Sequence, residues 1–251
     1  MKFLFELFLY QPIFNFFVWL YNVIPDVGVA IVLLTIIIKL ILHPLTSKSV
    51  KAQKELQDLQ PKLAELKKKH KGDQQAIAQA TMQLYKEHKV NPFGSCLPIL
   101  IQLPVFLALY WVLRDGLTSN NFDLLYSFVA NPGSINPMSL TMFDLSQPSI
   151  VLAVLAGAAQ FWQAKSMSTK RPPKGSGEGA KDEDTMAMVN KQMLYFMPVL
   201  TVIIGMSFPG GLALYWFLST FITAVHQHIV FRKKETSSKI PQGVIEGKIV
   251  D

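Results

Sequence analysis

Five long apolar stretches constrain the fold of this chain more than any other feature of its sequence. A helix that crosses a bilayer needs about 20 predominantly apolar residues, and these stretches approach that length. Half of the 251 residues are hydrophobic and only 16% are charged, yet the net charge is +7, so we expect apolar and basic residues in separate blocks. The sequence therefore predicts a membrane protein with spans at 27–42, 97–113, 150–163, 193–208 and 212–230.

These stretches are short for an ordinary bilayer, so either flanking residues complete the helices or the surrounding membrane is thinned. Residues 1–24 are rich in Phe, Tyr and Trp, but Glu6, Gln11 and Pro12 interrupt them. This pattern favours an interfacial amphipathic helix, and a further crossing is the alternative.

Lysine and arginine are unevenly distributed among the predicted connections. They are frequent in 47–91, in 168–190 and in the tail, whereas 116–147 contains neither. The positive-inside rule then places the N-terminus outside and the C-terminus in the cytoplasm. The predicted segments are an interfacial helix (1–24), a first transmembrane helix (25–46), a cytoplasmic helical hairpin (47–91), a second transmembrane helix (92–115), an extracytoplasmic loop (116–147), a third transmembrane helix (148–167), a flexible cytoplasmic loop (168–190), the fourth and fifth transmembrane helices (191–230) and a basic cytoplasmic tail (231–251).

The predicted hairpin has a helical pattern of its own. Leucines recur at intervals of three and four residues in its first arm, at Leu56, Leu59, Leu63 and Leu66. Asp73 is the predicted N-cap of the helix in the second arm. Its many lysines are explained by a solvated face near anionic lipid, and docking of a partner is the alternative.

Lys39 is the only charged residue well inside a predicted span. A lysine near the centre of a transmembrane helix costs on the order of 2.5–3.5 kcal/mol on insertion scales, which favours a functional reason for its position. The alternative is snorkelling toward the cytoplasmic end at Lys48, about 13 Å away along the helix. Thr35 precedes Lys39 by four residues and shares its helical face.

The usual catalytic motifs are absent. The chain has no GxSxG, HExxH, glycine-rich phosphate loop or paired cysteines, and His226 and His228 do not share a helical face. We expect no enzymatic activity, no cofactor and no metal. Channels and ion-coupled carriers usually carry several ionisable residues within the membrane, so a small-solute transporter or channel is the less favoured function.

Two segments carry a resemblance to a known family. NPFGSCLPILIQLPVFLALYWVL (91–113) and QMLYFMPVLTVIIGMSFPGGLALYWFLST (192–220) resemble signature segments of the YidC/Oxa/Alb family of membrane protein insertases. The first span with its following PLT (44–46) is similar too, and the resemblance extends over about 11–232 in order. Without a large extracytoplasmic domain before the first span, the chain resembles the shorter members of Gram-positive type.

The resemblance implies an all-α integral membrane protein with five transmembrane helices around a hydrophilic groove, open to the cytoplasm and the lipid and closed outside. It also implies one positive charge in the groove, which receives the polar, often acidic, part of an incoming protein. By position this charge is Lys39, where relatives more often carry arginine; lysine keeps the charge but loses the bidentate fork.

Other groove residues follow from the same resemblance. Thr35, Tyr215 and Trp216 match groove positions, although packing against lipid or another helix is an equal alternative for Trp216. Gln160 is a further polar candidate, whereas Gln102 and Gln163 are weaker ones, because glutamine in a span also joins helices by hydrogen bonds.

The implied function is to insert and help fold nascent membrane proteins, alone or with the Sec translocon, without a cofactor. The implied partners are these nascent proteins, the lipid bilayer, the Sec translocon and, more weakly, the ribosome. We expect the chain to act as a monomer in the bacterial inner (plasma) membrane. An assembly chaperone for proteins already inserted by the Sec translocon is a rival function that the sequence does not separate.

Overall fold

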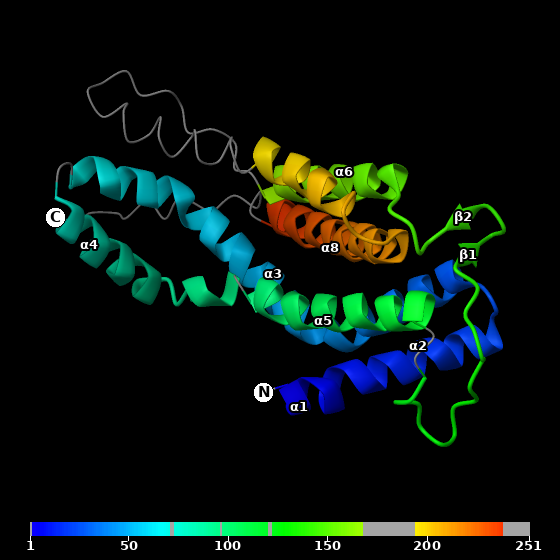
Figure 1. The fold of residues 1–251 in the computed structure, drawn as a ribbon. Helices are drawn as coiled ribbons and strands as arrows, with labels where there is room; N and C mark the ends of the chain where they lie inside the picture. The colour runs from blue at the N-terminus through cyan, green and yellow to red at the C-terminus, as the bar shows by residue number, and fades with distance from the viewer. Residues whose placement is uncertain (1, 71–72, 96, 120–121, 168–193, 238–251) are drawn as a thin grey trace, which may run out of the picture.

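A computed structural model of the chain describes residues 2–70, 73–95, 97–119, 122–167 and 194–237 (Figure 1). These residues are mostly helical. The helices are α1 (Lys2–Phe5), the π-helix η1 (Glu6–Tyr10), α2 (Gln11–Val23), α3 (Val27–Lys69), α4 (Gln74–Glu87), the 3₁₀ helix η2 (Pro92–Ser95), α5 (Leu97–Arg114), the π-helix η3 (Asp115–Ser119), α6 (Ile150–Met167), Leu194–Gly205 and α8 (Gly210–Ser237). The predicted flexible loop 168–190 and the tail beyond Ser237 lie outside the described residues.

One short sheet departs from the predicted all-α class. Strands β1 (Met138–Ser139) and β2 (Phe143–Asp144) pair antiparallel in the predicted extracytoplasmic loop. Three residues connect the paired Ser139 and Phe143, and the first two have positive φ, 50° at Leu140 and 59° at Thr141. The Met142 amide donates to the Ser139 carbonyl at 3.1 Å and closes the turn.

The first predicted span and the first arm of the predicted hairpin form a single helix. α3 contains 43 residues, which corresponds to about 65 Å, and includes Pro44 and Pro61 without a break. A bilayer core is only about 30 Å thick, so the C-terminal half of α3 extends beyond it. The hairpin is therefore joined to the span without a loop at the predicted boundary.

The hairpin itself follows its sequence pattern. The Asp73 carboxylate accepts hydrogen bonds from the backbone amides of Gln75 at 3.0 Å and Ala76 at 2.9 Å, which is the predicted N-cap of α4. Leu59 and Leu63 are buried, and the two arms α3 and α4 contact each other.

Three helices are long and apolar enough to cross a membrane, judged by length and composition over the described residues: Phe3–Val23, Val27–Lys67 and Leu100–Leu117. The second and third overlap the first two predicted spans. The Leu194–Gly205 helix is apolar but shorter. The first of the three lies in the segment predicted to be interfacial, and both its interfacial location and the count of five crossings stay predictions.

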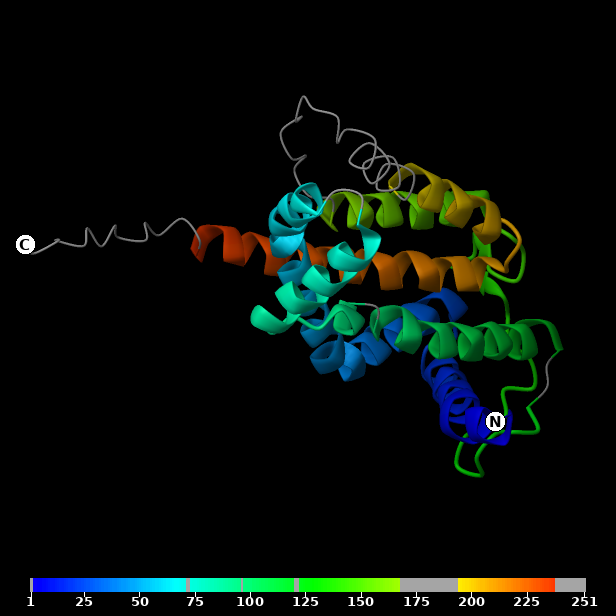
Figure 2. The same ribbon diagram turned by 90° about the vertical axis from the view of Figure 1, so that its left-hand side faces the viewer.

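The helices form two groups that meet along α3 (Figures 1 and 2). α6 packs closely on α8, and the Leu194–Gly205 helix lies against α6. A Cβ added to Gly157 of α6 would lie 2.5 Å from Val202 Cγ2, so the absence of a side chain there permits this close approach. α2 and α5 pack on α3, and α8 contacts both α3 and α5.

A dense apolar layer fills one end of the bundle. It combines aromatic residues of α2 with aliphatic residues of the N-terminal half of α3, the C-terminal half of α5 and the start of α8, including Phe14, Phe17, Ile31, Leu34, Leu109, Leu113 and Leu212, each at most 1% exposed. Burial on α3 is interrupted after Thr35, where Ile36, Leu40 and Ile41 are exposed, and it resumes at Ser49 and Val50. The packed layer therefore occupies only part of the length of the helices.

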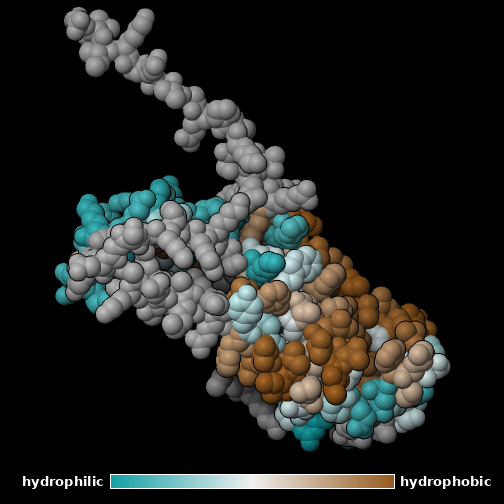
Figure 3. Space-filling model, turned by 90° about the horizontal axis from the view of Figure 1, so that it is seen from above, coloured by the Kyte–Doolittle hydropathy of each residue, from teal (hydrophilic) through white to brown (hydrophobic). Residues whose placement is uncertain are grey.

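The loop that lacks lysine and arginine ties this same end together. The Asp26 carboxylate, at the start of α3, accepts hydrogen bonds from Ser139 Oγ and the Leu140 amide, both at 2.7 Å. At the start of α8, the Gly210 amide donates to the Gln147 carbonyl at 2.8 Å. The lysine-rich hairpin lies at the opposite end (Figure 1). Figure 3 shows the corresponding contrast between a hydrophilic hairpin and a largely hydrophobic bundle.

Candidate functional site

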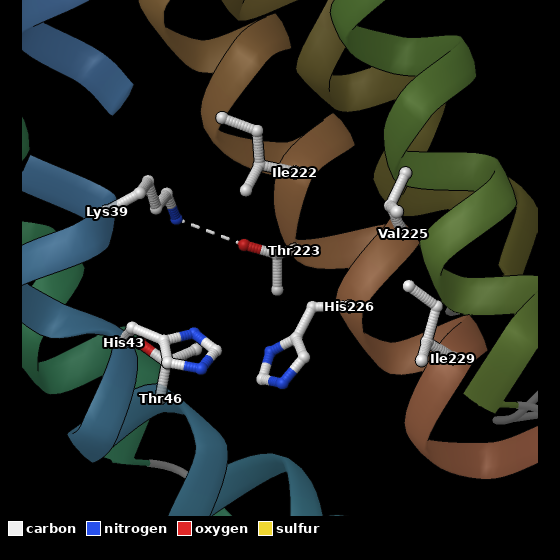
Figure 4. Close-up of a pocket in the computed structure, with 8 residues that line it drawn as sticks. All are labelled: Lys39, His43, Thr46, Ile222, Thr223, Val225, His226 and Ile229. Carbon is white, nitrogen blue, oxygen red and sulfur yellow. Dashed lines mark hydrogen bonds between the residues drawn. The ribbon is translucent and has the colours of Figure 1, made fainter. Parts of the chain in front are cut away.

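Lys39 lies just beyond the apolar layer, where three helices meet. Its Nζ donates a hydrogen bond to Thr223 Oγ1 on α8 at 3.0 Å, and a longer one to Gln102 Oε1 on α5 at 3.5 Å. Figure 4 shows the lysine side chain reaching from α3 toward α8. Both partners are neutral oxygen atoms, so these contacts solvate the ammonium group without neutralising a positive charge.

Gln102 connects Lys39 to the predicted groove residue Tyr215. Its Nε2 donates to the Tyr215 hydroxyl, and its Oε1 accepts from Ser219 Oγ at 3.4 Å. Tyr215 is 1% exposed and belongs to the apolar layer. The polar network thus starts at the packed layer and extends away from it through Gln102 to Lys39.

Two polar stripes with a four-residue spacing face each other across this region. Residues that lie every four positions along a helix share one face. α3 presents one stripe, and α8 presents the other, with contacts between them at Lys39 and at Ser47, whose Oγ lies 3.4 Å from His226 Nε2. The stripes are Thr35, Lys39, His43 and Ser47 on α3, and Tyr215, Ser219 and Thr223 followed by His226 on α8.

A cavity of about 250 Å³ separates the two stripes beyond Lys39 (Figure 4). It is lined by residues of α3 and α8, namely Lys39, His43, Thr46, Ile222, Thr223, Val225, His226 and Ile229. None of these lining residues is a carboxylate. A cavity with basic and hydroxyl groups and no acid suits a polar or anionic group.

The predicted site residues fall into two sets. Lys39 and Tyr215 come together through Gln102. Gln160 instead accepts a hydrogen bond from Thr201 and so joins α6 to the Leu194–Gly205 helix. Trp216 packs edge-on against Phe106, with ring centroids 5.4 Å apart, as the packing alternative predicts.

Thr35 is fully buried, and its hydroxyl donates to the Ile31 carbonyl of its own helix at 2.6 Å. It shares the face of Lys39, as predicted, but it belongs to the boundary of the packed layer and is inaccessible to a bound molecule. Ser219, Thr223 and His43 were not among the predicted site residues. The sequence does contain a signal for them, because Tyr215, Ser219 and Thr223 are spaced by four residues and so share one helical face. The same spacing joins Thr35, Lys39 and His43.

Comparisons with known proteins agree on one family. The profile of the 60Kd inner membrane protein family matches residues 19–238. The chain is 36% identical over 230 residues to the membrane protein insertase YidC of Fusobacterium nucleatum, which covers 90% of this chain and 98% of that relative. It is 34% identical over 231 residues to the membrane protein insertase YidC of Tolumonas auensis, covering 91% of this chain and 37% of that one.

A solved structure described as an active YidC insertase, with its first transmembrane domain resolved, is also similar. The match has a TM-score of 0.58 at 26% identity and covers 89% of this chain and 46% of the other. The chain thus spans nearly all of the Fusobacterium relative but little more than a third of the Tolumonas one.

Proposed function

This chain belongs to the 60Kd inner membrane protein family, and we propose that the cavity between α3 and α8 is the part of a hydrophilic groove in which it receives its clients. The chain is a membrane protein insertase that inserts and helps fold nascent membrane proteins, and it is not an enzyme. A small-solute transporter or channel is not favoured. Insertion alone and insertion with the Sec translocon are both part of the proposal.

The single observation that carries this role for the cavity is the set of contacts around Lys39. Its ammonium group is held by Thr223 and Gln102, whose neutral oxygens a client carboxylate can replace. Hydrogen bonds to charged groups contribute roughly 1.5–3 kcal/mol, more than those between neutral groups. Charge attraction is also stronger in a partly apolar cavity than in bulk water.

The apolar layer supports a groove that is closed on one side. Phe17, Leu34 and Leu113 are at most 1% exposed in this layer, and the cavity lies beyond it, toward the hairpin. In the proposed mechanism, the polar flank of a client enters near Lys39 and is then only a short distance from the outer side. The apolar segment of the client leaves into lipid along α8, past the partly exposed Trp216, and its burial at about 25 cal/mol per Å² drives insertion.

We place the N-terminus outside and the C-terminus in the cytoplasm, with five crossings. This orientation is supported by the lysine-free loop and the lysine-rich hairpin, which lie at opposite ends of the bundle (Figure 1).

The interfacial location of residues 1–24 has separate support. α8 is seen at full length in Figure 2, where α2 is foreshortened, and the reverse holds in Figure 1, so the two helices point in different directions.

The proposed partners beyond the clients are the lipid bilayer, the Sec translocon and, through basic residues, the ribosome. The family and the apolar helices indicate the bacterial inner membrane. We further propose that the monomer is functional, because the polar network around Lys39 is completed by α3, α5 and α8 of one chain.

Reconstitution tests this function directly. The purified chain is placed in protein-free liposomes, a short single-spanning client with an acidic tail is synthesised outside them, and protection of the tail from protease is measured. We expect protection well above that in empty liposomes, without Sec components. Equal protection in both samples would remove the insertase role and leave the assembly chaperone, which requires clients already inserted.

A further inference from the structure

We propose that His43 and His226 act together with Lys39 as a titratable cationic cluster, which makes the cavity more selective for acidic clients as the pH falls. This inference rests on the proposed insertase role of the same cavity. It assigns a role in client selection to two histidines that lie outside the predicted site.

The two histidines approach each other from different helices. The ring centroids of His43 on α3 and His226 on α8 are 4.9 Å apart, with 43° between the ring planes. Both rings line the cavity that Lys39 also lines, and Figure 4 shows them facing each other across it. His43 follows Lys39 by one helical turn, so the three basic groups share one polar space.

Ser47 links the two imidazoles at the same nitrogen position. Its Oγ lies 3.3 Å from His43 Nε2 and 3.4 Å from His226 Nε2. A serine hydroxyl has one proton to donate, so it can donate to only one of these nitrogens, and the other Nε2 must carry a proton to complete a second hydrogen bond. The arrangement therefore already accommodates one Nε2–H, and further proton uptake by either ring adds positive charge to the cavity.

None of the described residues that line the cavity around the pair is acidic. Of the residues that line the cavity, Lys39, His43 and His226 are the titratable ones, and the remainder are Thr46, Thr223 and aliphatic side chains. On α6, Trp162 faces His228 with ring centroids 6.3 Å apart, and α5 contributes the neutral Gln102 to Lys39. Protonation of the pair thus adds positive charge to a cavity that Lys39 also lines.

The consequence is a preference that depends on pH. Histidine is the side chain whose charge ordinarily changes between about pH 5 and about pH 8, whereas client aspartates and glutamates stay ionised above about pH 5. Lowering the pH over this range raises the charge of the cavity without removing that of the client. Clients with acidic tails are therefore attracted more strongly to the cavity at lower pH, whereas clients with neutral tails are not.

The test compares two clients that differ only in tail charge, one with aspartates and one with asparagines at the same positions. Insertion into liposomes is measured at about pH 5.5 and about pH 7.5, and the acidic-to-neutral ratio is formed at each. For the wild-type chain we expect this ratio to rise about fivefold at the lower pH, the effect of a further unit charge several ångströms from the client carboxylates.

The double variant His43→Gln/His226→Gln keeps hydrogen-bonding side chains but cannot gain charge, and we expect its ratio to stay nearly constant. Lys39 is present in every variant, so any response that belongs to Lys39 persists. His228→Gln, on the same helix but facing Trp162, is the matched control and should behave as the wild type. His43→Lys should give a high ratio at both pH values.

The outcomes separate the two claims. If wild-type chain inserts neither client at either pH, the proposed function fails and this inference fails with it. If both clients are inserted but the ratio does not change with pH, only the histidine inference is overturned. A ratio that changes equally in the double variant also overturns it, because the response then lies outside the pair.

Discussion

At the scale of single residues, Lys39 shows how a charge is accommodated in an apolar helix. Its ammonium group reaches Thr223 and Gln102, and these lie on two other helices. The contacts explain the position of the lysine better than snorkelling does, because the side chain points across the bundle between α3 and α8 (Figure 4). A residue that snorkels would instead direct its amine along α3 to the membrane surface.

Replacement of Lys39 tests its charge. Lys39→Ala should lower insertion of an acidic-tailed client about tenfold, the value of one lost charge-assisted hydrogen bond. Lys39→Arg should retain most of the activity, because the charge survives. Insertion is measured by complementation after depletion of the native insertase in cells and by protease protection in liposomes. Equal insertion by both variants would show that the charge has no role.

A second residue-scale prediction concerns Asp26, which precedes the Val27–Lys67 helix. Burial alone would raise the pKa of the Asp26 carboxyl, but hydrogen bonds from the Leu140 amide, the Ser139 hydroxyl and the Val29 amide lower the pKa below its usual value. A lowered pKa stabilises the folded state above the pKa of the unfolded chain, and this stabilisation is lost as the pH falls through the folded-state pKa.

Asp26→Asn should therefore lower the thermal unfolding temperature in detergent at about pH 7, and the difference from wild type should shrink at about pH 3. Asp123→Asn, a change of the same type in the same connection as Ser139, controls for general effects of lost acidic charge. A difference that is constant over the pH range would contradict the role of the ionised Asp26 carboxylate.

At the scale of elements, the contact between α6 and the Leu194–Gly205 helix depends on small residues. A Cβ on Gly157 would lie 2.5 Å from Val202 Cγ2 and 3.0 Å from the Pro198 carbonyl oxygen, and one on Gly205 would lie 3.1 Å from Ala153 Cβ. Gln160 and Thr201 add a hydrogen bond across the same contact. The two helices are held by close backbone approach together with a polar pair, as is common in membranes.

Gly157→Val should force these helices apart and lower the free energy of unfolding by about 2–3 kcal/mol, the cost of overpacking a tight contact. Ala158→Val, at the adjacent exposed position of α6, should have little effect. Unfolding in detergent, followed by circular dichroism, measures both. Equal destabilisation by the two variants would place the effect in the β-branched side chain and not in the helix contact.

At the scale of the whole molecule, the chain has two dissimilar ends. One end is closed by the apolar layer and by the loop that Asp26 and Gly210 hold in place. The other end carries the cavity and the hairpin, and α3 extends continuously from the first to the second. Because α3 is one helix, the segment that bears Lys39 and His43 is joined to the first arm of the hairpin without a loop.

Cysteine labelling tests which end faces which side. After Cys96→Ser, a cysteine replacing the 79% exposed Phe128 should react with a membrane-impermeant maleimide in intact cells. A cysteine replacing Gln83, on the exposed face of α4, should react only after the cells are opened. Labelling of both from the same side would contradict the proposed orientation.

Much of the architecture follows from local sequence patterns. The apolar stretches, the charge difference between the connections and the Asp73 cap depend on neighbouring residues and on the solvent around them, and no knowledge of distant contacts is needed. The structure confirms the Asp73 cap, and the helices Val27–Lys67 and Leu100–Leu117 overlap the first two predicted spans. The family was also predicted from local sequence, because its signature segments are continuous stretches of the chain.

The partners of individual polar side chains were decided only by tertiary packing. Gln102 and Gln160 look alike in the sequence, because each is a glutamine in an apolar helix. In the structure, Gln102 forms hydrogen bonds with both Lys39 and Tyr215, whereas Gln160 accepts a hydrogen bond from Thr201. The same holds for His43 and His226, which lie far apart along the chain and meet only because α3 packs on α8. Local composition determines which segments are apolar helices, whereas the rotation of each helix about its axis, set by side-chain packing with the others, determines which polar groups meet.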